Sequence, residues 1–371
     1  MTVSERFSVP ALILGAGAWG TALAIHWSKR AQPGQVSLWG RRPEHVKELE
    51  ATRLNQRYLP GVKLPDTLDL SPNLKAALLA FRERSQCDAK TPGGLIVLAC
   101  PVAGLSQLAA EVTETLGPAQ PGEGLLWLSK GLVQDGDAFC WPSDLVRRAM
   151  KADWPMAALT GPSFAMEVAK GLPCALTAAS ADLGFARRLS RICHGGGMRV
   201  YASDDLLGAE LGGAVKNIMA IAAGVADGLG LGANARAALL TRGLAETARL
   251  AVALGARPES MLGLAVLGDL VLTATGDLSR NRRVGLGLAK GEPLQQILQI
   301  LGHVAEGVNA SRAVAGLARF HQVDMPIVQA VCQLLSGEQS AKAILSELLS
   351  RDPVDELDVS IAEAAKDLST P

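Results

Sequence analysis

No charge of one sign dominates this sequence, whose 371 residues include 36 Lys or Arg and 36 Asp or Glu, a formal net charge of zero. The balance gives no indication of nucleic acid or an anionic membrane as a partner. Aromatic residues are also scarce, at 4%, whereas 49% of the residues are hydrophobic and glycine is abundant. Such a composition is typical of a soluble, tightly packed protein that is rich in helices or of the α/β class.

Paired cysteines, leader-like segments and long apolar runs are missing as well. The cysteines show no Cys-x-x-Cys pair and no ligand-like spacing to histidine; they are Cys87, Cys100, Cys140, Cys174, Cys193 and Cys332. They predict reduced packing residues, and we expect neither a disulfide framework nor a metal site. The N-terminal residues do not resemble a signal peptide, and the apolar runs around 218–225 and 262–272 are too short or interrupted to span a bilayer. We therefore expect a cytoplasmic protein.

The pattern of apolar runs changes at about residue 201. Before it, short strand-like runs alternate with helical stretches; the runs are residues 9–14, 36–39, 94–100, 125–128, 157–160 and one that ends at Tyr201. After it, the periodicity is helical, with Gly and Pro at the breaks. Because 371 residues are too many for one compact core, we expect two domains. The predicted fold class is α/β, with an N-terminal Rossmann-type doubly wound sheet over residues 1–201 and an all-α C-terminal substrate domain over residues 202–371. Residues 81–93 look like a surface insertion.

A glycine-rich turn, with Gly15, Gly17 and Gly20, follows the first apolar run and opens a helical pattern that leads to a second strand. In this context a Gly-x-Gly-x-x-Gly motif indicates a dinucleotide site far more specifically than the motif alone. Gly15 permits the tight turn, Gly17 lets a pyrophosphate approach the backbone, and Gly20 lets helix and strand pack closely. The N-terminus of the helix offers unpaired N–H groups to the phosphates.

Two arginines follow the second strand, at the place where an NAD site usually has an acidic residue for the ribose 2′-hydroxyl. The sequence there is Gly40-Arg41-Arg42, and guanidinium groups suit a 2′-phosphate because they bind it in a bidentate manner. We therefore predict NADPH as the cofactor, with NADH as a second possibility; Arg41 is the better candidate for the phosphate contact and Arg42 the second. Alternatively, both are solvated loop charges, or one of them pairs with Glu44.

A single lysine, Lys216, lies near the start of a long apolar segment, residues 210–230. Because an ammonium group is costly to desolvate, it needs a partner or a function. Its stem could pack on apolar surface while its head reaches water, which is the usual fate of lysine. Alternatively, burial lowers its pKa until it transfers a proton near neutral pH, and the rest of the chain favours this second interpretation. Lys130 follows a strand, at a sheet rim where we expect it to meet an anionic ligand.

A group of polar residues follows in the second half of the chain. Asp269 interrupts an apolar run, Thr273 comes one turn later, and residues 279–283 read Ser-Arg-Asn-Arg-Arg. Three guanidinium groups with a hydroxyl and an amide would form a cradle for a phosphate monoester. A solvated basic loop would have the same composition. Four more charged residues could form ion pairs between helices: Asp227, Arg236, Arg242 and Glu246.

Taken together, these motifs resemble the bacterial-type NAD(P)-dependent glycerol-3-phosphate dehydrogenases over nearly the whole chain. The matching segments are GAGAWGTALA at 15–24, LSKGL at 128–132, GPSFAMEVAKGLP at 161–173, ELGGAVKNIMAIAAGVADGLGLGANARAALLTRGLAE at 210–246, GLAVLGDLVLT at 263–273, SRNRRVG at 279–285 and VAEGV at 304–308. The C-terminal half is the more specific part, since many dehydrogenases share the glycine turn.

The resemblance implies reversible reduction of dihydroxyacetone phosphate to sn-glycerol 3-phosphate, which would supply phospholipid synthesis. It implies that Lys216 is the acid–base residue, that Asp269 orients it or a substrate hydroxyl, and that Lys130 contacts both substrate and cofactor. The residues that match the family's other substrate positions are Gly161, Ser163, Ser279, Arg280 and Asn281. Those that match its cofactor positions outside the glycines are Ala18, Trp19, Arg41, Arg42, Ala165, Arg280, Val304 and Glu306. The family often has Ser at the place of Ala18, so only a backbone N–H remains there for the pyrophosphate.

Two other interpretations stay open. A related two-domain dehydrogenase that acts on another hydroxy acid or a sugar acid would use the same arginines for a carboxylate. A regulatory protein that binds NADPH without turnover is a different class, but it would have little need of Lys216 in an apolar helix. We expect no nucleic acid and no membrane insertion. We also expect a homodimer, because helical second domains of this kind often pair, although the sequence itself does not fix the oligomeric state.

Overall fold

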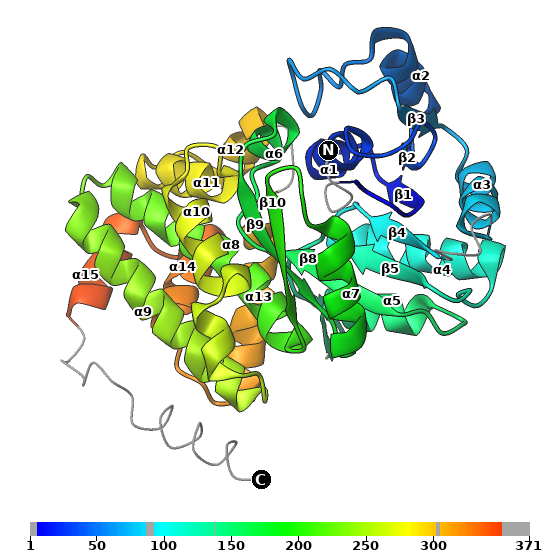
Figure 1. The fold of residues 1–371 in the computed structure, drawn as a ribbon. Helices are drawn as coiled ribbons and strands as arrows, with labels where there is room; N and C mark the ends of the chain where they lie inside the picture. Colours follow the sequence, from blue (N-terminus) through cyan, green and yellow to red (C-terminus); the bar gives the residue numbers. More distant parts are fainter. Residues whose placement is uncertain (1–5, 87–92, 137, 302–304, 351–371) are drawn as a thin grey trace. The chain divides into compact units, whose positions relative to one another are not determined.

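The computed structural model describes residues 6–86, 93–136, 138–301 and 305–350, which belong to two compact units (Figure 1). The first unit comprises residues up to 129 together with 141–206, and the second comprises 130–140 together with the residues from 207 onward. We predicted a continuous first domain over residues 1–201. In the structure, residues 130–140 belong to the second unit, because they pack on its helices and not on the sheet of the first unit.

The first unit is built on an eight-stranded sheet with the order β10-β9-β8-β5-β4-β1-β2-β3. Its strands are β1 (Ala11–Leu14), β2 (Val36–Trp39), β3 (Leu68–Ser71), β4 (Gly94–Leu98), β5 (Glu123–Trp127), β8 (Met156–Thr160), β9 (Cys174–Ala179) and β10 (Met198–Ser203). Within this order, the six strands β8-β5-β4-β1-β2-β3 pair in parallel with their neighbours. Because β9 pairs antiparallel with β8 and parallel with β10, the last two strands run against the other six. The predicted Rossmann-type sheet is confirmed, and β3 and β9 are additions to it.

The central strands are buried on both faces, which explains why they read as continuous apolar runs; every residue of β1 and β2 is buried. The helices of this unit are α1 (Ala18–Ser28), α2 (Pro43–Thr52), α3 (Leu74–Gln86), α4 (Leu105–Leu116), α5 (Pro142–Ala149), α6 (Ala165–Lys170) and α7 (Leu183–Cys193), with a short 3₁₀ turn η2 (Val102–Gly104). The expected surface insertion at 81–93 is wrong for its first part. Residues 81–86 are the last turns of α3, and Phe81 is buried in the core; residues 87–92 lie outside the described part.

Among its described residues, the second unit is helical apart from one hairpin, β6 (Val133–Asp135) and β7 (Ala138–Cys140), which we did not predict in an all-α domain. Its helices are α8 (Leu206–Gly228), α9 (Gly232–Ala253), α10 (Asp269–Thr275), α11 (Arg280–Ala289), α12 (Leu294–Leu301), α13 (Glu306–Phe320), α14 (Pro326–Ser336) and α15 (Ala341–Leu349), with short turns η3 (Pro258–Leu262) and η4 (Leu264–Gly268). The hairpin packs on α13, where the Phe139 ring lies against Gly316.

Helix α8 is the centre of the second unit, and Figure 1 shows it among α9, α10 and α13. Its length and composition would allow it to cross a membrane, but 94% of its most apolar window is buried inside the protein. Such burial is expected of a helix in the core of a protein rather than of a helix that faces lipid.

A buried carboxylate joins α9 to α14. Glu246 is only 2% exposed, and its two oxygens accept hydrogen bonds from the backbone N–H groups of Ile327 and Val328, at 2.8 and 3.4 Å. These amides belong to the first turn of α14, whose N-cap residue supplies no side-chain bond. The sequence suggested an ion pair for Glu246. The structure shows a helix cap from a remote segment instead.

Burial raises the pKa of Glu246 to about 7, against the opposing effect of the two amides. Since this folded-state pKa lies above the ordinary value near 4.5, the folded protein binds the extra proton between these pH values. We therefore expect the free energy of unfolding of the wild type, relative to Glu246→Gln, to fall by up to about 3 kcal/mol as the pH rises from about 4.5 to about 7. Urea unfolding across this range measures the difference. The exposed Glu259→Gln variant is the control, and an equal slope in all three proteins would contradict the assignment.

Candidate functional site

Two lysine side chains of the second unit meet at one carboxylate, that of Asp269. Asp269, the first residue of α10, accepts a hydrogen bond at Oδ1 from Lys216 Nζ and another at Oδ2 from Lys130 Nζ, each at 2.6 Å. Thr273 lies one helical turn after Asp269, and its Oγ1 accepts from Lys216 Nζ at 3.1 Å. Lys130 is 139 residues from Asp269 in the sequence, and Lys216 is 53 residues from it. The fold thus brings together three residues that the sequence singled out separately.

The local structure explains how each group reaches this point. Lys216 projects from α8, whose small apolar residues let neighbouring segments approach closely, and the lysine is only 9% exposed. Asp269 follows directly on the π-helical turn η4, in which the Gly268 N–H donates to the Gly263 carbonyl oxygen at 3.2 Å. Such π-turns are rare and are found frequently at functional sites, where they aim a side chain out of regular helical register.

The electrostatics of the cluster favour a lysine that can lose its proton near neutral pH. Burial lowers the pKa of Lys216 to about 8; the Asp269 carboxylate opposes this effect and the Lys130 ammonium adds to it. Burial alone would raise the pKa of Asp269, but the ammonium groups of Lys130 and Lys216 hold it below its ordinary value. Asp269 is therefore an anion at neutral pH, and Lys216 is a cation that can give up a proton.

Glu306 stands near this cluster at the first position of α13, where it is partly buried. Burial raises its pKa, and the cationic groups of Arg280, Lys216 and Lys130 oppose the rise. A carboxyl group with a raised pKa keeps its proton to a higher pH than an ordinary glutamate, and in that protonated form it can donate a hydrogen bond.

A pair of asparagines ties three helices together beside Lys216. The Asn281 amide of α11 donates to Asn217 Oδ1 at 2.9 Å, and Asn281 Oδ1 accepts from the Gly307 N–H of α13 at 3.1 Å. Asn217 in turn donates to the Gly213 carbonyl oxygen of α8 at 3.2 Å. Asn281, expected at the substrate, is thus buried in a network that fixes α8, α11 and α13 relative to one another.

The basic segment at the start of α11 is divided between structural and exposed roles. Ser279 is the N-cap residue of α11, and its Oγ accepts from the Arg282 N–H at 3.2 Å. Arg282 forms ion pairs with Asp227 at 2.7 Å and with Asp277 at 3.0 Å. Of the three arginines of the expected cradle, Arg282 is thus held in ion pairs, whereas Arg280 and Arg283 are exposed.

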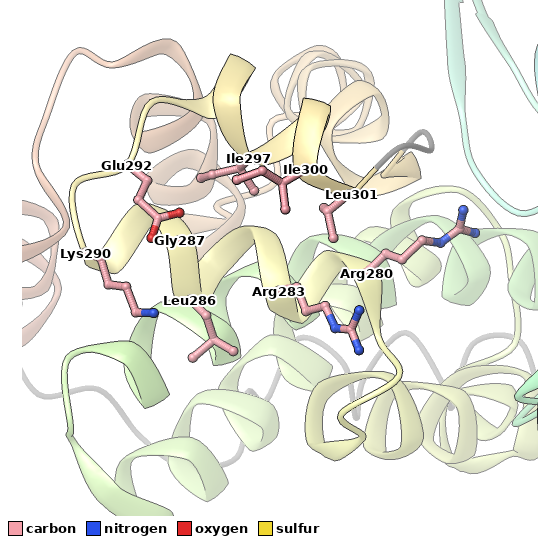
Figure 2. Close-up of a pocket in the computed structure, with 9 residues that line it drawn as sticks. All are labelled: Arg280, Arg283, Leu286, Gly287, Lys290, Glu292, Ile297, Ile300 and Leu301. Carbon is pink, nitrogen blue, oxygen red and sulfur yellow. The ribbon is translucent and has the colours of Figure 1, made fainter.

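Arg280 and Arg283 border a groove of about 390 Å³ between α11 and α12. Figure 2 shows both arginines and Lys290 extending from α11, while three apolar side chains project from α12 on the other side: Ile297, Ile300 and Leu301. The α11 side of the groove thus carries three cationic groups beside Leu286, the α12 side is apolar, and Glu292 from the loop between the two helices adds a carboxylate.

In the first unit the glycine turn between β1 and α1 has the geometry that a pyrophosphate requires. Gly15 has a φ of +137°, and a Cβ there would collide with the Ala99 backbone; a Cβ on Gly20 would collide with the Gly15 carbonyl group. Gly17 is the N-cap of α1, no side chain caps this helix, and a Cβ on Gly17 would meet no atom within 4 Å. The space beside Gly17 is therefore open, as the close approach of a pyrophosphate to the backbone needs. Ala18 and Trp19 form the half-buried first turn.

The two arginines after β2 differ in their surroundings. Arg41 is exposed, whereas Arg42 is half-buried, donates to the Tyr58 hydroxyl at 2.8 Å and lies over the Tyr58 ring, 6.0 Å from its centroid. Neither arginine pairs with Glu44 in the described part of the chain. The ion-pair alternative for this segment is thus not seen.

Three comparisons place this geometry among known proteins. Family models described as the N-terminus and the C-terminus of NAD-dependent glycerol-3-phosphate dehydrogenase match residues 10–186 and 205–346. The chain is 52% identical over 346 residues to a glycerol-3-phosphate dehydrogenase (NAD(P)+) of Ralstonia nicotianae, an alignment that covers 92% of this chain and 97% of the relative. The chain belongs to the NAD(P)-dependent glycerol-3-phosphate dehydrogenase family. It is an oxidoreductase of that family.

Solved structures support the same conclusion. A crystal structure of glycerol-3-phosphate dehydrogenase from Coxiella burnetii superposes with a TM-score of 0.81 at 39% identity, over 93% of this chain and 100% of that one. A glycerol-3-phosphate dehydrogenase from Plasmodium falciparum has a TM-score of 0.80 at 18% identity, over 95% and 97% of the two chains, which shows a shared fold alone.

The remaining residues that match the family's motifs lie at the carboxyl end of β8. Gly161 directly follows this strand with a φ of +124°, and the Ser163 hydroxyl donates to the Gly161 carbonyl oxygen at 3.1 Å. Ala165 is the first residue of α6. Strand ends of this kind are where α/β folds bind ligands. Val304, expected at the cofactor, lies outside the described residues.

Sequence reasoning missed some of the polar residues that support the family's motifs. Asn55 is buried; its amide donates to the Ala16 carbonyl oxygen of the glycine turn at 3.1 Å and to Thr21 Oγ1 at 2.8 Å. Its Oδ1 accepts from the Tyr58 N–H at 3.3 Å, so it connects the glycine turn to the partner of Arg42. A lone asparagine in a polar loop carries no sequence signal of such a role. Thr273 gave a weak signal through its spacing of four from Asp269 on a helix.

Proposed function

We propose that this protein reduces dihydroxyacetone phosphate reversibly to sn-glycerol 3-phosphate with NADPH, and that NADH also serves. The observation that carries this proposal is the ammonium of Lys216, buried and shared with Asp269 at 2.6 Å, with a pKa lowered to about 8. The reaction needs a proton at the carbonyl oxygen near neutral pH, and such a lysine supplies one. A cytoplasmic enzyme of this kind would provide glycerol phosphate for phospholipid synthesis.

When bound at the glycine turn, the nicotinamide cofactor would supply the hydride for C2 of the ketone. As the hydride arrives, the C2 oxygen gains negative charge, and Lys216 donates a proton to it to give the secondary alcohol; in the reverse direction Lys216 accepts that proton. The positive charges of Lys216 and Lys130 stabilise the developing alkoxide before the proton is transferred. Asp269 holds both ammonium groups in place, so that little reorganisation is needed during the reaction.

The other residues would bind and orient. The exposed guanidinium of Arg280 would hold the phosphate end of the substrate and contact the cofactor. Ser279 and Asn281 would contribute through their backbone or through the order they impose on the start of α11. The glycine turn with Ala18 and Trp19 would bind the pyrophosphate, and Arg41 and Arg42 the 2′-phosphate. Gly161, Ser163, Ala165, Val304 and Glu306 remain proposed ligand contacts, and a homodimer remains our expectation for the assembly.

The direct test is the oxidation of NADPH, followed by absorbance, with dihydroxyacetone phosphate as the substrate, and then the same assay with NADH. We expect turnover with both and a higher kcat/KM with NADPH. Replacement of Arg41 and Arg42 together by Ser should lower kcat/KM for NADPH by about tenfold to a hundredfold and leave that for NADH nearly unchanged, since two charge-assisted hydrogen bonds are lost only with the phosphate. Equal losses with both cofactors would contradict the 2′-phosphate contact, and no turnover at all would contradict the proposed reaction.

A further inference from the structure

Two adjacent glycines, Gly212 and Gly213, lie one helical turn before Lys216 in the interior of α8. Both are buried, and neither has a positive φ. A glycine in a helix interior costs about 1 kcal/mol relative to alanine, so the pair weakens the central helix of the unit unless packing requires it. What surrounds each glycine shows what the packing requires.

Gly212 lets the turn before Asp269 touch the helix. A Cβ on Gly212 would lie 2.5 Å from Val266 Cγ2 and 3.0 Å from the Ala265 carbonyl oxygen and Val266 Cα. These atoms belong to η4, the π-helical turn that leads directly into Asp269. Any side chain at 212 would therefore push this turn, and the carboxylate after it, away from α8.

Gly213 lets the stem of Lys130 lie across the helix. A Cβ on Gly213 would lie 3.3 Å from both Cβ and Cγ of Lys130 and 3.7 Å from its Cδ. The lysine has little freedom to withdraw, because its Nζ is held 2.6 Å from Asp269 Oδ2 and its side chain is only 12% exposed. A methyl group at 213 would displace the stem by a few tenths of an ångström or more.

The two glycines stand four and three residues before Lys216, so all three share one side of the helix. We infer that Gly212 and Gly213 are positioning residues of the catalytic cluster: Gly212 admits the segment that carries Asp269, and Gly213 admits the stem of Lys130, so that both reach Lys216. This inference rests on the proposed function for its effect on turnover. The geometry of the cluster that it explains is independent of the reaction.

Displacement of Lys130 has a consequence that a general loss of packing would not have. The ammonium of Lys130 contributes to lowering the pKa of Lys216, and it shares the Asp269 carboxylate with it. If Lys130 moves away, Lys216 loses a neighbouring positive charge and keeps the carboxylate to itself. Both changes favour the charged form of Lys216 and raise its pKa.

The test is Gly213→Ala in the full-length protein, with Gly213→Leu as a larger step. We expect kcat for the reduction to fall by about tenfold in the alanine variant and by roughly a hundredfold in the leucine variant, as for misplacements of a fraction of an ångström to about 1 Å. We also expect the high-pH limb of the kcat profile to move to higher pH in the alanine variant. Gly228→Ala is the matched control, because a Cβ there would lie 2.5 Å from the Ala289 Cβ, at the other end of the same helix. It should change thermal stability without moving the pH limb.

A double-mutant cycle with Lys130→Ala decides whether Gly213 acts through Lys130. If it does, the Gly213→Ala change should lower kcat about tenfold in the wild-type background and hardly at all in the Lys130→Ala background. An equal loss in both backgrounds would overturn the inference for Gly213.

A measurement without substrate separates this inference from the proposed function. In protein labelled at lysine Cε, the NMR titration of Lys216 should have a higher midpoint in Gly213→Ala than in wild type, whatever reaction the protein catalyses. An unchanged midpoint in a folded variant would overturn the inference. Absence of wild-type turnover with a raised midpoint would overturn the proposed reaction alone.

Discussion

Replacement of Lys216 by alanine should lower kcat for dihydroxyacetone phosphate reduction by roughly a thousandfold or more, the range lost when a general acid is removed together with its electrostatic effect. The variant loses both the proton donor and the cation that faces the developing alkoxide. The affinity for NADPH, measured by fluorescence titration, should change little, because the glycine turn that we propose for the pyrophosphate belongs to the first unit.

A surface lysine provides the matched control for this variant. Lys342 is exposed on α15, and Lys342→Ala should leave both kcat and NADPH affinity unchanged. Thermal unfolding of Lys216→Ala should show a folded protein, since Asp269 keeps Lys130 as a partner. If Lys216→Ala retained more than about a tenth of the wild-type turnover, a loss too small for a general acid, the acid–base assignment would be wrong. A folded variant that lost NADPH binding would instead place Lys216 at the cofactor.

Features that depend on neighbours in the sequence were predicted well. The strand at Val36–Trp39 has the predicted bounds, and the glycine turn opens a helix as its motif requires. These predictions hold because a parallel strand that is buried on both faces has a continuous apolar run, and the tight turn after it has a glycine motif. Both signals lie in consecutive residues of the sequence. Lys216 was recognised for the same reason: the free-energy cost of burying its charge is evident from the apolar residues next to it in the sequence.

Features that depend on long-range packing were not predictable in the same way. Lys130 follows a strand of the first unit, and the sequence alone assigned it to that unit's rim. The structure assigns Lys130 to the second unit, because the hairpin after it packs on α13 through a contact between Phe139 and Gly316. No pattern in the neighbouring residues predicts this contact. Charged residues show the same limit. Arg282 lies in a basic segment and was predicted to bind a phosphate. In the structure it forms an ion pair with Asp227, which is 55 residues away in the sequence.

Asp269 is the only anion that touches both lysines among the described residues, so its replacement by asparagine should have the second large effect. An amide of nearly the same shape would remove the carboxylate that the ammonium groups of Lys216 and Lys130 share. Loss of one partner of a buried ion pair costs about 3–5 kcal/mol. We expect urea unfolding to show a loss of this order at neutral pH. The pKa of Asp269 is held below its ordinary value, so the loss should shrink as the pH falls through the acid range in which the wild-type carboxylate becomes protonated.

The pH profile of the same variant tests the electrostatic role of Asp269. In the wild type the rate of reduction should fall as the pH rises through about 8, where Lys216 loses its proton, and the rate of glycerol 3-phosphate oxidation should rise over the same range. Because the carboxylate raises the pKa of Lys216, Asp269→Asn should move the limb of the reduction profile to lower pH and reduce kcat at neutral pH by about a hundredfold or more. Asp277→Asn is the control: Asp277 is almost fully exposed and pairs with Arg282, so its loss should cost little. A limb that stayed at the wild-type pH in Asp269→Asn would mean that Lys216 is not the titrating acid.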